Sequence, residues 1–232
     1  MLLFVVTALA ADVDRVPQDF PTLQAAVDEG TAPVIRLGKG RWAGATVDRA
    51  VQIVGDEAII DRGVDAGRLT PALHLVAGAD GVTVEGVRVD CDGQVDAGVF
   101  SSVRRGGLAT DVVVRDSGFR GCVQGVTVAG DGATDALWWI EGNRFHGIGA
   151  APLRGGQGGA LGIVAVDVAM VDVVDNRFVG WVDEVEGFTT AETALVGCER
   201  CSVVGNRFEA VGGVTHEAVV EDGARVPRQS AP

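Results

Sequence analysis

Short apolar runs separated by turn residues recur along the chain, and their regular spacing is the strongest signal in the sequence. The copies follow the order apolar, polar, turn, Asn, Arg, Phe, with other residues at the Asn, Arg or Phe places in the first two copies and Val at the polar place in the last two. The position of the Asn recurs after 30, 26, 33 and 30 residues, a period typical of solenoid proteins. The five copies are Val84–Val89, Val114–Phe119, Ile140–Phe145, Val173–Phe178 and Val203–Phe208.

A second short β-run follows at a similar offset, as in residues 125–128, 161–166 and 194–196. Two or three strands per coil without helices between them predict an all-β fold, a single-stranded right-handed parallel β-helix. The 34 Gly and the low aromatic content of 5% suit short strands joined by tight turns. Stacked coils should form an interior column and a turn column of laddered amides: Phe119, Phe145, Phe178 and Phe208 inside, and Asn143, Asn176 and Asn206 in the turn.

The segment before the first coil has the pattern of a short helix. Thr22 is a good N-cap residue, and Leu23, Ala26 and Val27 form an apolar stripe at helical spacing that ends before Gly30. Because a solenoid exposes its core at each end, it needs such a cap.

These features resemble the pectate lyase-like β-helix superfamily. The Asn-Arg-Phe turns and the coil spacing are similar to its repeats, and Phe20 to Asp28 resembles the segment that opens many members, including pectin methylesterases. The resemblance covers roughly residues 17–220 and implies the architecture and the capping helix. It does not imply a reaction, because such motifs specify the fold.

Residues 1–11 are apolar and end in Ala8-Leu9-Ala10, the small-x-small pattern of a signal-peptidase site. We therefore expect them to be a signal peptide, with a first β-strand as the alternative. Residues 12–220 would then form the β-helix domain and residues 221–232 a polar tail. We expect a secreted, periplasmic or cell-surface protein with no membrane span.

The formal net charge of −13 and the single lysine, Lys39, argue against a nucleic-acid partner. A polyanionic substrate would also be repelled unless a local arginine cluster or a bound cation reversed the field. The partner that we expect is a polysaccharide or a cell-surface glycan.

The four cysteines are an even number, which in an exported chain favours disulfides. Cys91 and Cys122 are about one coil apart, so their Cα atoms could come within disulfide distance. Cys198 and Cys201 could close a short loop. A zinc site shared by all four is disfavoured, because the two pairs are separated by more than one coil.

Side-chain alternation places the residues next to each interior Phe on the outer face of the strands. Asp90, Arg120 and His146 would therefore stack on three neighbouring coils, and His146 is a candidate general base or acid beside a carboxylate and an arginine. The alternative, which we favour, is an ionic ladder that neutralises charge between coils.

A second outer column is expected to contain Glu85, Arg115, Glu141 and Asp175. Trp138-Trp139-Ile140-Glu141 resembles a pectate lyase strand that precedes an Asp-His pair, with Glu141 at the place of the Asp. The place of the His is taken by Gly142, so lyase activity is not supported.

Alternation should expose Trp139, which could stack against a sugar or pack under a loop. We predict substrate-binding roles for four residues: Trp139, Glu141, Arg144 and Arg177.

Asp90, Asp92 and Asp96 lie in or just after an Asp-x-Asp-Gly run that could provide Ca²⁺ ligands. A solvated turn is the interpretation that we favour. No other cofactor is expected.

We predict an exported β-helix repeat protein that binds a glycan or another partner without catalysis. The alternative is a polysaccharide lyase, hydrolase or esterase of the same superfamily whose motifs have diverged.

Overall fold

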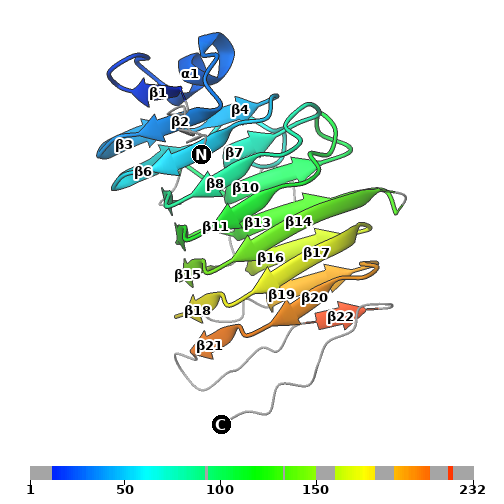
Figure 1. Ribbon diagram of the computed structural model, residues 1–232. Helices are drawn as coiled ribbons and strands as arrows, with labels where there is room; N and C mark the ends of the chain where they lie inside the picture. The colour runs from blue at the N-terminus through cyan, green and yellow to red at the C-terminus, as the bar shows by residue number, and fades with distance from the viewer. Residues whose placement is uncertain are drawn as a thin grey trace, which may run out of the picture.

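The computed structural model describes residues 12–91, 94–132, 134–149, 160–180, 191–209 and 219–221. These residues form a stack of β-coils with one short helix at the N-terminal end (Figure 1). The strands belong to three parallel sheets, so the predicted all-β parallel β-helix is confirmed. The expected signal peptide (residues 1–11) and nearly all of the expected tail (residues 222–232) lie outside the described residues.

After β1, which belongs to sheet A alone, each coil contributes one strand to each sheet, and equivalent strands of successive coils pair in parallel. Sheet A contains β1 (Val13–Val16), β2 (Val34–Leu37), β5 (Gln52–Gly55), β8 (Thr83–Glu85), β11 (Val113–Arg115), β14 (Asp135–Glu141), β17 (Ala169–Val174) and β20 (Ser202–Val204). Sheet B contains β3 (Gly40–Ala43), β6 (Ala58–Arg62), β9 (Arg88–Asp90), β12 (Gly118–Arg120), β15 (Arg144–His146), β18 (Arg177–Val179) and β21 (Arg207–Glu209). Sheet C contains β4 (Ala45–Val47), β7 (Pro71–Leu75), β10 (Ala97–Ser102), β13 (Gln124–Ala129), β16 (Leu161–Val166), β19 (Ala191–Val196) and β22 (Val219–Glu221).

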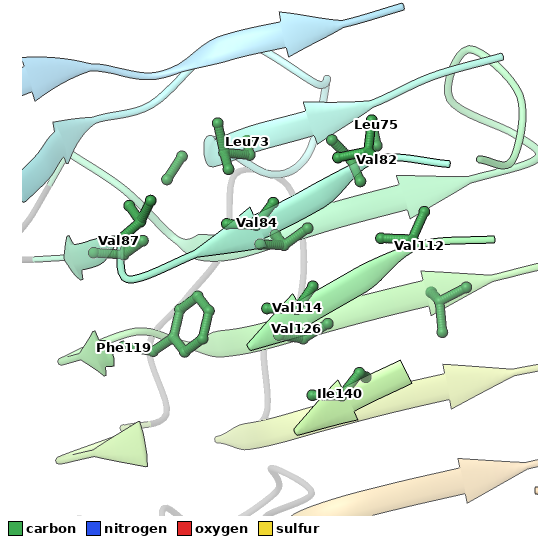
Figure 2. Close-up of a cluster of buried hydrophobic side chains, with 14 of the residues drawn as sticks. Leu73, Leu75, Val82, Val84, Val87, Val112, Val114, Phe119, Val126 and Ile140 are labelled. Carbon is green, nitrogen blue, oxygen red and sulfur yellow. The ribbon is translucent and has the colours of Figure 1, made fainter. Parts of the chain in front are cut away.

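The interior is filled by stacked columns of like side chains. The predicted phenylalanine column is confirmed: neighbouring rings from Phe119 to Phe208 stack with centroids 5.0, 4.8 and 5.1 Å apart. Valine, leucine and isoleucine, most of them from sheets A and C, fill much of the rest of the core (Figure 2). Opposite the rings, β10 and β13 place Gly98 and Gly125, where an added Cβ would overlap Phe119 and Phe145. Small residues on sheet C therefore make room for the rings.

The turn between sheets A and B contains the predicted asparagine ladder. Asn143 donates its side-chain amide to Asn176 Oδ1 at 3.0 Å, and Asn176 donates in the same way to Asn206 Oδ1 at 3.0 Å. Ser117 continues the column, because its backbone N–H donates to Asn143 Oδ1 at 3.0 Å. The three asparagines are buried, so these bonds satisfy backbone groups that water does not reach.

Asn176→Ala should lower the free energy of unfolding by about 2 kcal/mol, because it leaves buried polar groups without partners. The Asn176 side chain accepts from Asn143 N at 2.9 Å and donates to Ile140 O at 2.8 Å. Urea denaturation measures the effect, with exposed Asp175→Ala in the same turn as the control. Equal stability of the two variants would contradict a structural role for the ladder.

The predicted helix is α1 (Leu23–Glu29), and Thr22 Oγ1 caps it by accepting from Ala25 N at 3.1 Å. Arg49, from the turn after β4, binds the other end of the helix through Val27 O at 3.0 Å and Ala26 O at 3.1 Å. Leu23, Ala26 and Val27 are buried against the first coil, so the apolar stripe covers the core as expected.

Both expected disulfides are present. Cys91 and Cys122 join the ends of β9 and β12 on adjacent coils, with Cα atoms 4.8 Å apart. Cys198 and Cys201 close a short turn before β20, with Cα atoms 5.9 Å apart. In the part of the chain that the structure describes, no helix has the length and apolar character needed to cross a membrane.

Candidate functional site

An open hollow of about 330 Å³ lies over sheet A, at the ends of the strands where the chain arrives from sheet C. Its size is near the lower end of the range for small-molecule sites. Its lining combines apolar and charged residues from successive coils: Asp111, Val113, Leu137, Trp138, Trp139, Met170, Asp172 and Arg200.

Trp139 presents an indole to this hollow, as strand alternation predicts. Trp138 points inward and is 1% exposed, whereas Trp139 points outward and is 40% exposed. The Trp139 Nε1–H donates to Glu141 Oε2 at 2.9 Å, which fixes one edge of the ring. Val113 and Asp172 are its partners on the neighbouring strands, so a small side chain and a carboxylate flank the indole.

The backbone beside Trp139 has an unusual conformation that repeats on four successive coils. Asp111, Leu137, Met170 and Arg200 have φ values of 56°, 55°, 61° and 55°. For residues with a Cβ this left-handed region costs about 1 kcal/mol each, and long side chains such as Leu and Met are rare in it. A register shift in β14 next to Leu137 accompanies the column. Such bulges re-aim side chains, and Leu137 is 45% exposed at the hollow.

The charged groups of the hollow are held by hydrogen bonds between coils. Ser202 donates its hydroxyl to Asp172 Oδ1, and Arg200 Nη2 pairs with Asp135 Oδ1 at 2.6 Å. Asp111 is exposed at the edge of the hollow. The arrangement offers carboxylate acceptors, a guanidinium and an indole face, which together can bind the hydroxyls and the apolar face of a sugar.

The register places Asp90, Arg120 and His146 side by side on sheet B, as expected. Arg120 and His146 are exposed, whereas Asp90 Oδ2 binds Arg41 Nη2 at 3.1 Å. A hollow of about 210 Å³ lies beside Asp90 and is lined by Arg41, Asp61, Arg62, Asp90 and Gln94, without Arg120 or His146. This pairing agrees with an ionic ladder, and a catalytic role for the three residues stays a prediction.

The expected Ca²⁺ ligands are partly engaged by the protein. Asp96 Oδ2 accepts from Thr70 N at 3.1 Å, Asp90 binds Arg41, and Asp92 lies outside the described residues. Among the residues whose placement is described, no group of three or more His, Cys, Asp or Glu is arranged to hold a metal ion. Ca²⁺ binding therefore stays a prediction without structural support.

The second outer column agrees with the expectation for its first three residues but not for its fourth. Glu85 pairs with Arg115 at 2.7 Å, and the hydrogen bond from Arg115 holds the pKa of Glu85 below its usual value. Glu141 is the next residue of the column, but its neighbour on β17 is Val174. The expectation for Asp175 was wrong: Val174 takes the place beside Glu141, and Asp175 follows it in the turn, with φ 51°.

Arg144 and Arg177 lie on a different sheet from Trp139 and Glu141. They are register partners on β15 and β18 of sheet B, and Arg177 Nη2 pairs with Glu209 Oε2 at 2.8 Å. The four predicted substrate-binding residues therefore belong to two surfaces.

Sequence reasoning missed most of the lining of the hollow over sheet A. Leu137, Met170, Asp172 and Arg200 lie outside the Asn-Arg-Phe motif, and no motif announces a left-handed conformation at Leu or Met. One available signal was the coil period, since Met170 and Arg200 are 30 residues apart, as are Asp172 and Ser202.

The chain matches no family model, and neither the curated proteins nor the solved structures contain a match to it. The class that the structure itself defines is a disulfide-containing parallel β-helix.

Proposed function

We propose that this chain is an exported β-helix repeat protein of the pectate lyase-like superfamily that binds a glycan in the hollow over sheet A without catalysis. The observation that carries the proposal is the exposed Trp139 indole, anchored by Glu141 at the border of the hollow. A rigid, partly exposed indole next to fixed polar groups suits a sugar ring, whose two faces differ in polarity.

Charge favours a neutral glycan at this site. The hollow contains Asp111 and Asp172, and among the described residues that line it the one cationic side chain, Arg200, is already paired with Asp135. A neutral sugar can donate its hydroxyls to the two carboxylates, whereas an anionic sugar would be repelled.

Export is supported by the two disulfides and by the apolar pattern of residues 1–11. Disulfides persist in oxidising compartments, and both cysteine pairs of the chain are joined. A glycan-binding protein would meet polysaccharides or cell-surface glycans in such a compartment.

A polysaccharide-processing enzyme is the alternative, and the register contact of Asp90, Arg120 and His146 is the observation in its favour. Arg120 and His146 are exposed on an open strand face, and Asp90 is held in an ion pair with Arg41. Both observations favour binding over catalysis. Release of new chain ends from a polysaccharide by the wild type, and its loss in His146→Ala, would establish the enzyme instead.

Trp139→Ala should weaken binding to a neutral glycan by about tenfold or more, because an exposed aromatic side chain that the ligand covers contributes a large share of the binding free energy. An array of neutral polysaccharides first identifies a ligand of the wild type, and titration calorimetry then compares the variants. Trp139→Phe should retain part of the affinity, since it keeps an aromatic face.

Val204→Ala is the matched control, because it removes an apolar side chain that is 46% exposed on sheet A but does not line the hollow. Unchanged binding in Trp139→Ala would remove the hollow from the proposed function.

A further inference from the structure

Five arginines occupy the outer face of the last five strands of sheet B, which are β9, β12, β15, β18 and β21. They lie on consecutive strands along one side of the stack, where β15, β18 and β21 are seen in Figure 1. All five are exposed, since the interior positions of these strands are taken by Val89 and the phenylalanine column. The cationic face consists of Arg88, Arg120, Arg144, Arg177 and Arg207.

Three of these arginines are stacked in direct register. Arg144 pairs in the sheet with Arg177, and Arg177 pairs with Arg207. Neighbouring strands are about 4.8 Å apart, so three like charges face the solvent at nearly the closest spacing that a sheet allows. Like charges directly opposite one another tend to destabilise a sheet.

The carboxylates of the same face offset only part of this charge: Glu209 binds Arg177 and also attracts Arg144 and Arg207, which help to lower its pKa. On the outward positions of these five strands of sheet B, the acidic residues are Asp90, which binds Arg41, and Glu209, which binds Arg177. Within the described residues no ion pair engages the four remaining arginines of the face: Arg88, Arg120, Arg144 and Arg207.

This local excess of positive charge contrasts with the rest of the molecule. The face carries five arginines against two carboxylates, whereas the chain as a whole has a formal net charge of −13. Because the chain as a whole is strongly acidic, this face offers an anionic ligand a local region of opposite charge.

We propose that the outer face of β9, β12, β15, β18 and β21 binds a linear anionic polysaccharide along the axis of the stack. Each guanidinium presents a planar set of donors that matches a carboxylate or sulfate group. The repeat of about 4.8 Å between coils is close to the length of one sugar unit, so successive charged sugars can meet successive arginines.

The composition of the face favours a glycan over a nucleic acid. Proteins that bind single strands combine a basic groove with aromatic side chains on which bases stack. The outward positions of β9, β12, β15, β18 and β21 contain no Phe or Trp, and His146 is their one aromatic side chain. Double-stranded DNA would also bring many phosphates close to the acidic remainder of the chain.

The inference extends the proposed glycan-binding function to a second surface and does not depend on the hollow over sheet A. Trp139 and Arg144 lie on different sheets, so each site can be removed alone. The neutral glycan of the hollow and the anionic glycan of the arginine face are different ligands.

The test measures binding of the full disulfide-bonded chain to alginate, a linear polymer with a carboxylate on every sugar. Arg144→Gln with Arg207→Gln should weaken binding about tenfold, because two exposed charge contacts are lost. Binding by the wild type should also weaken as salt rises. The control is Arg36→Gln with Arg68→Gln, which changes the net charge equally but alters two exposed arginines outside sheet B.

Loss of alginate binding in the sheet B pair, with normal binding in the control pair and in Trp139→Ala, supports the proposal. Equal loss in both arginine pairs overturns it, because the effect would then follow net charge alone. No alginate binding by the wild type, or tighter binding to single-stranded DNA of equal charge, also overturns it. Failure of the proposed function of the hollow is recognised by a different result, which is unchanged binding of the neutral glycan in Trp139→Ala.

Discussion

Phe145→Ala is expected to lower the free energy of unfolding by about 4 kcal/mol, the largest effect of any substitution considered for this chain. Phe145 is fully buried and stacks on Phe119 at 5.0 Å and on Phe178 at 4.8 Å. Removing its ring therefore leaves a cavity in the middle of a continuous column. The opposing strands cannot close the cavity easily, because their hydrogen bonds to the coils on either side hold their positions.

Chemical denaturation followed by tryptophan fluorescence measures this loss. Phe208→Ala is the matched control, since Phe208 is partly exposed and has Phe178 as its stacking partner in the column. Its cost should be well below that of Phe145→Ala. Equal costs at the two positions would show that burial in the column does not determine stability.

The coil repeat could be recognised from sequence because a solenoid uses each position of the repeat for one physical task. The phenylalanine must fill the interior, and the asparagine must satisfy backbone groups in a buried turn. Both tasks impose a residue type, so the type recurs at the coil period. The helix was predicted for a similar reason, since Thr22 and the apolar stripe each have a local role.

Features that depend on neighbouring coils were not visible in the same way. β1, the first strand of sheet A, pairs with β2 but lies outside the repeat motif. Arg41 binds Asp90 across 49 residues, a partnership that neither local sequence suggests. Asp175 was placed one residue out of register: Val174 pairs with Glu141, and Asp175 lies in the turn.

The candidate sites show the same difference between features that follow from local sequence and features that depend on neighbouring coils. Exposure of Trp139 followed from simple alternation, whereas the hollow beside it depends on a register shift and on left-handed residues of four coils. The arginine face lies between these cases. Arg144, Arg177 and Arg207 share the Arg place of the repeat, so the motif predicts their stacking and the register confirms it, whereas Arg120 lies outside the repeat copies.

Removal of the Cys91–Cys122 disulfide by Cys91→Ala with Cys122→Ala should lower the free energy of unfolding by roughly 3.5 kcal/mol. The bond joins residues 31 apart, so the unlinked unfolded chain gains considerable freedom. Cys198→Ala with Cys201→Ala is the control: it opens a loop with a sequence separation of 3 and should cost roughly 2 kcal/mol.

Both cysteine pairs are buried, so the two double variants lose similar packing and the difference between them isolates the length of the loop. Urea denaturation of the wild type and both variants, with and without a reductant, measures that difference. A reductant should destabilise the wild type to near the level of a variant lacking both bonds, which is the behaviour expected of a protein that folds in an oxidising compartment. A wild type whose stability is unchanged by complete reduction would contradict a stabilising role for the disulfides and would remove their support for export.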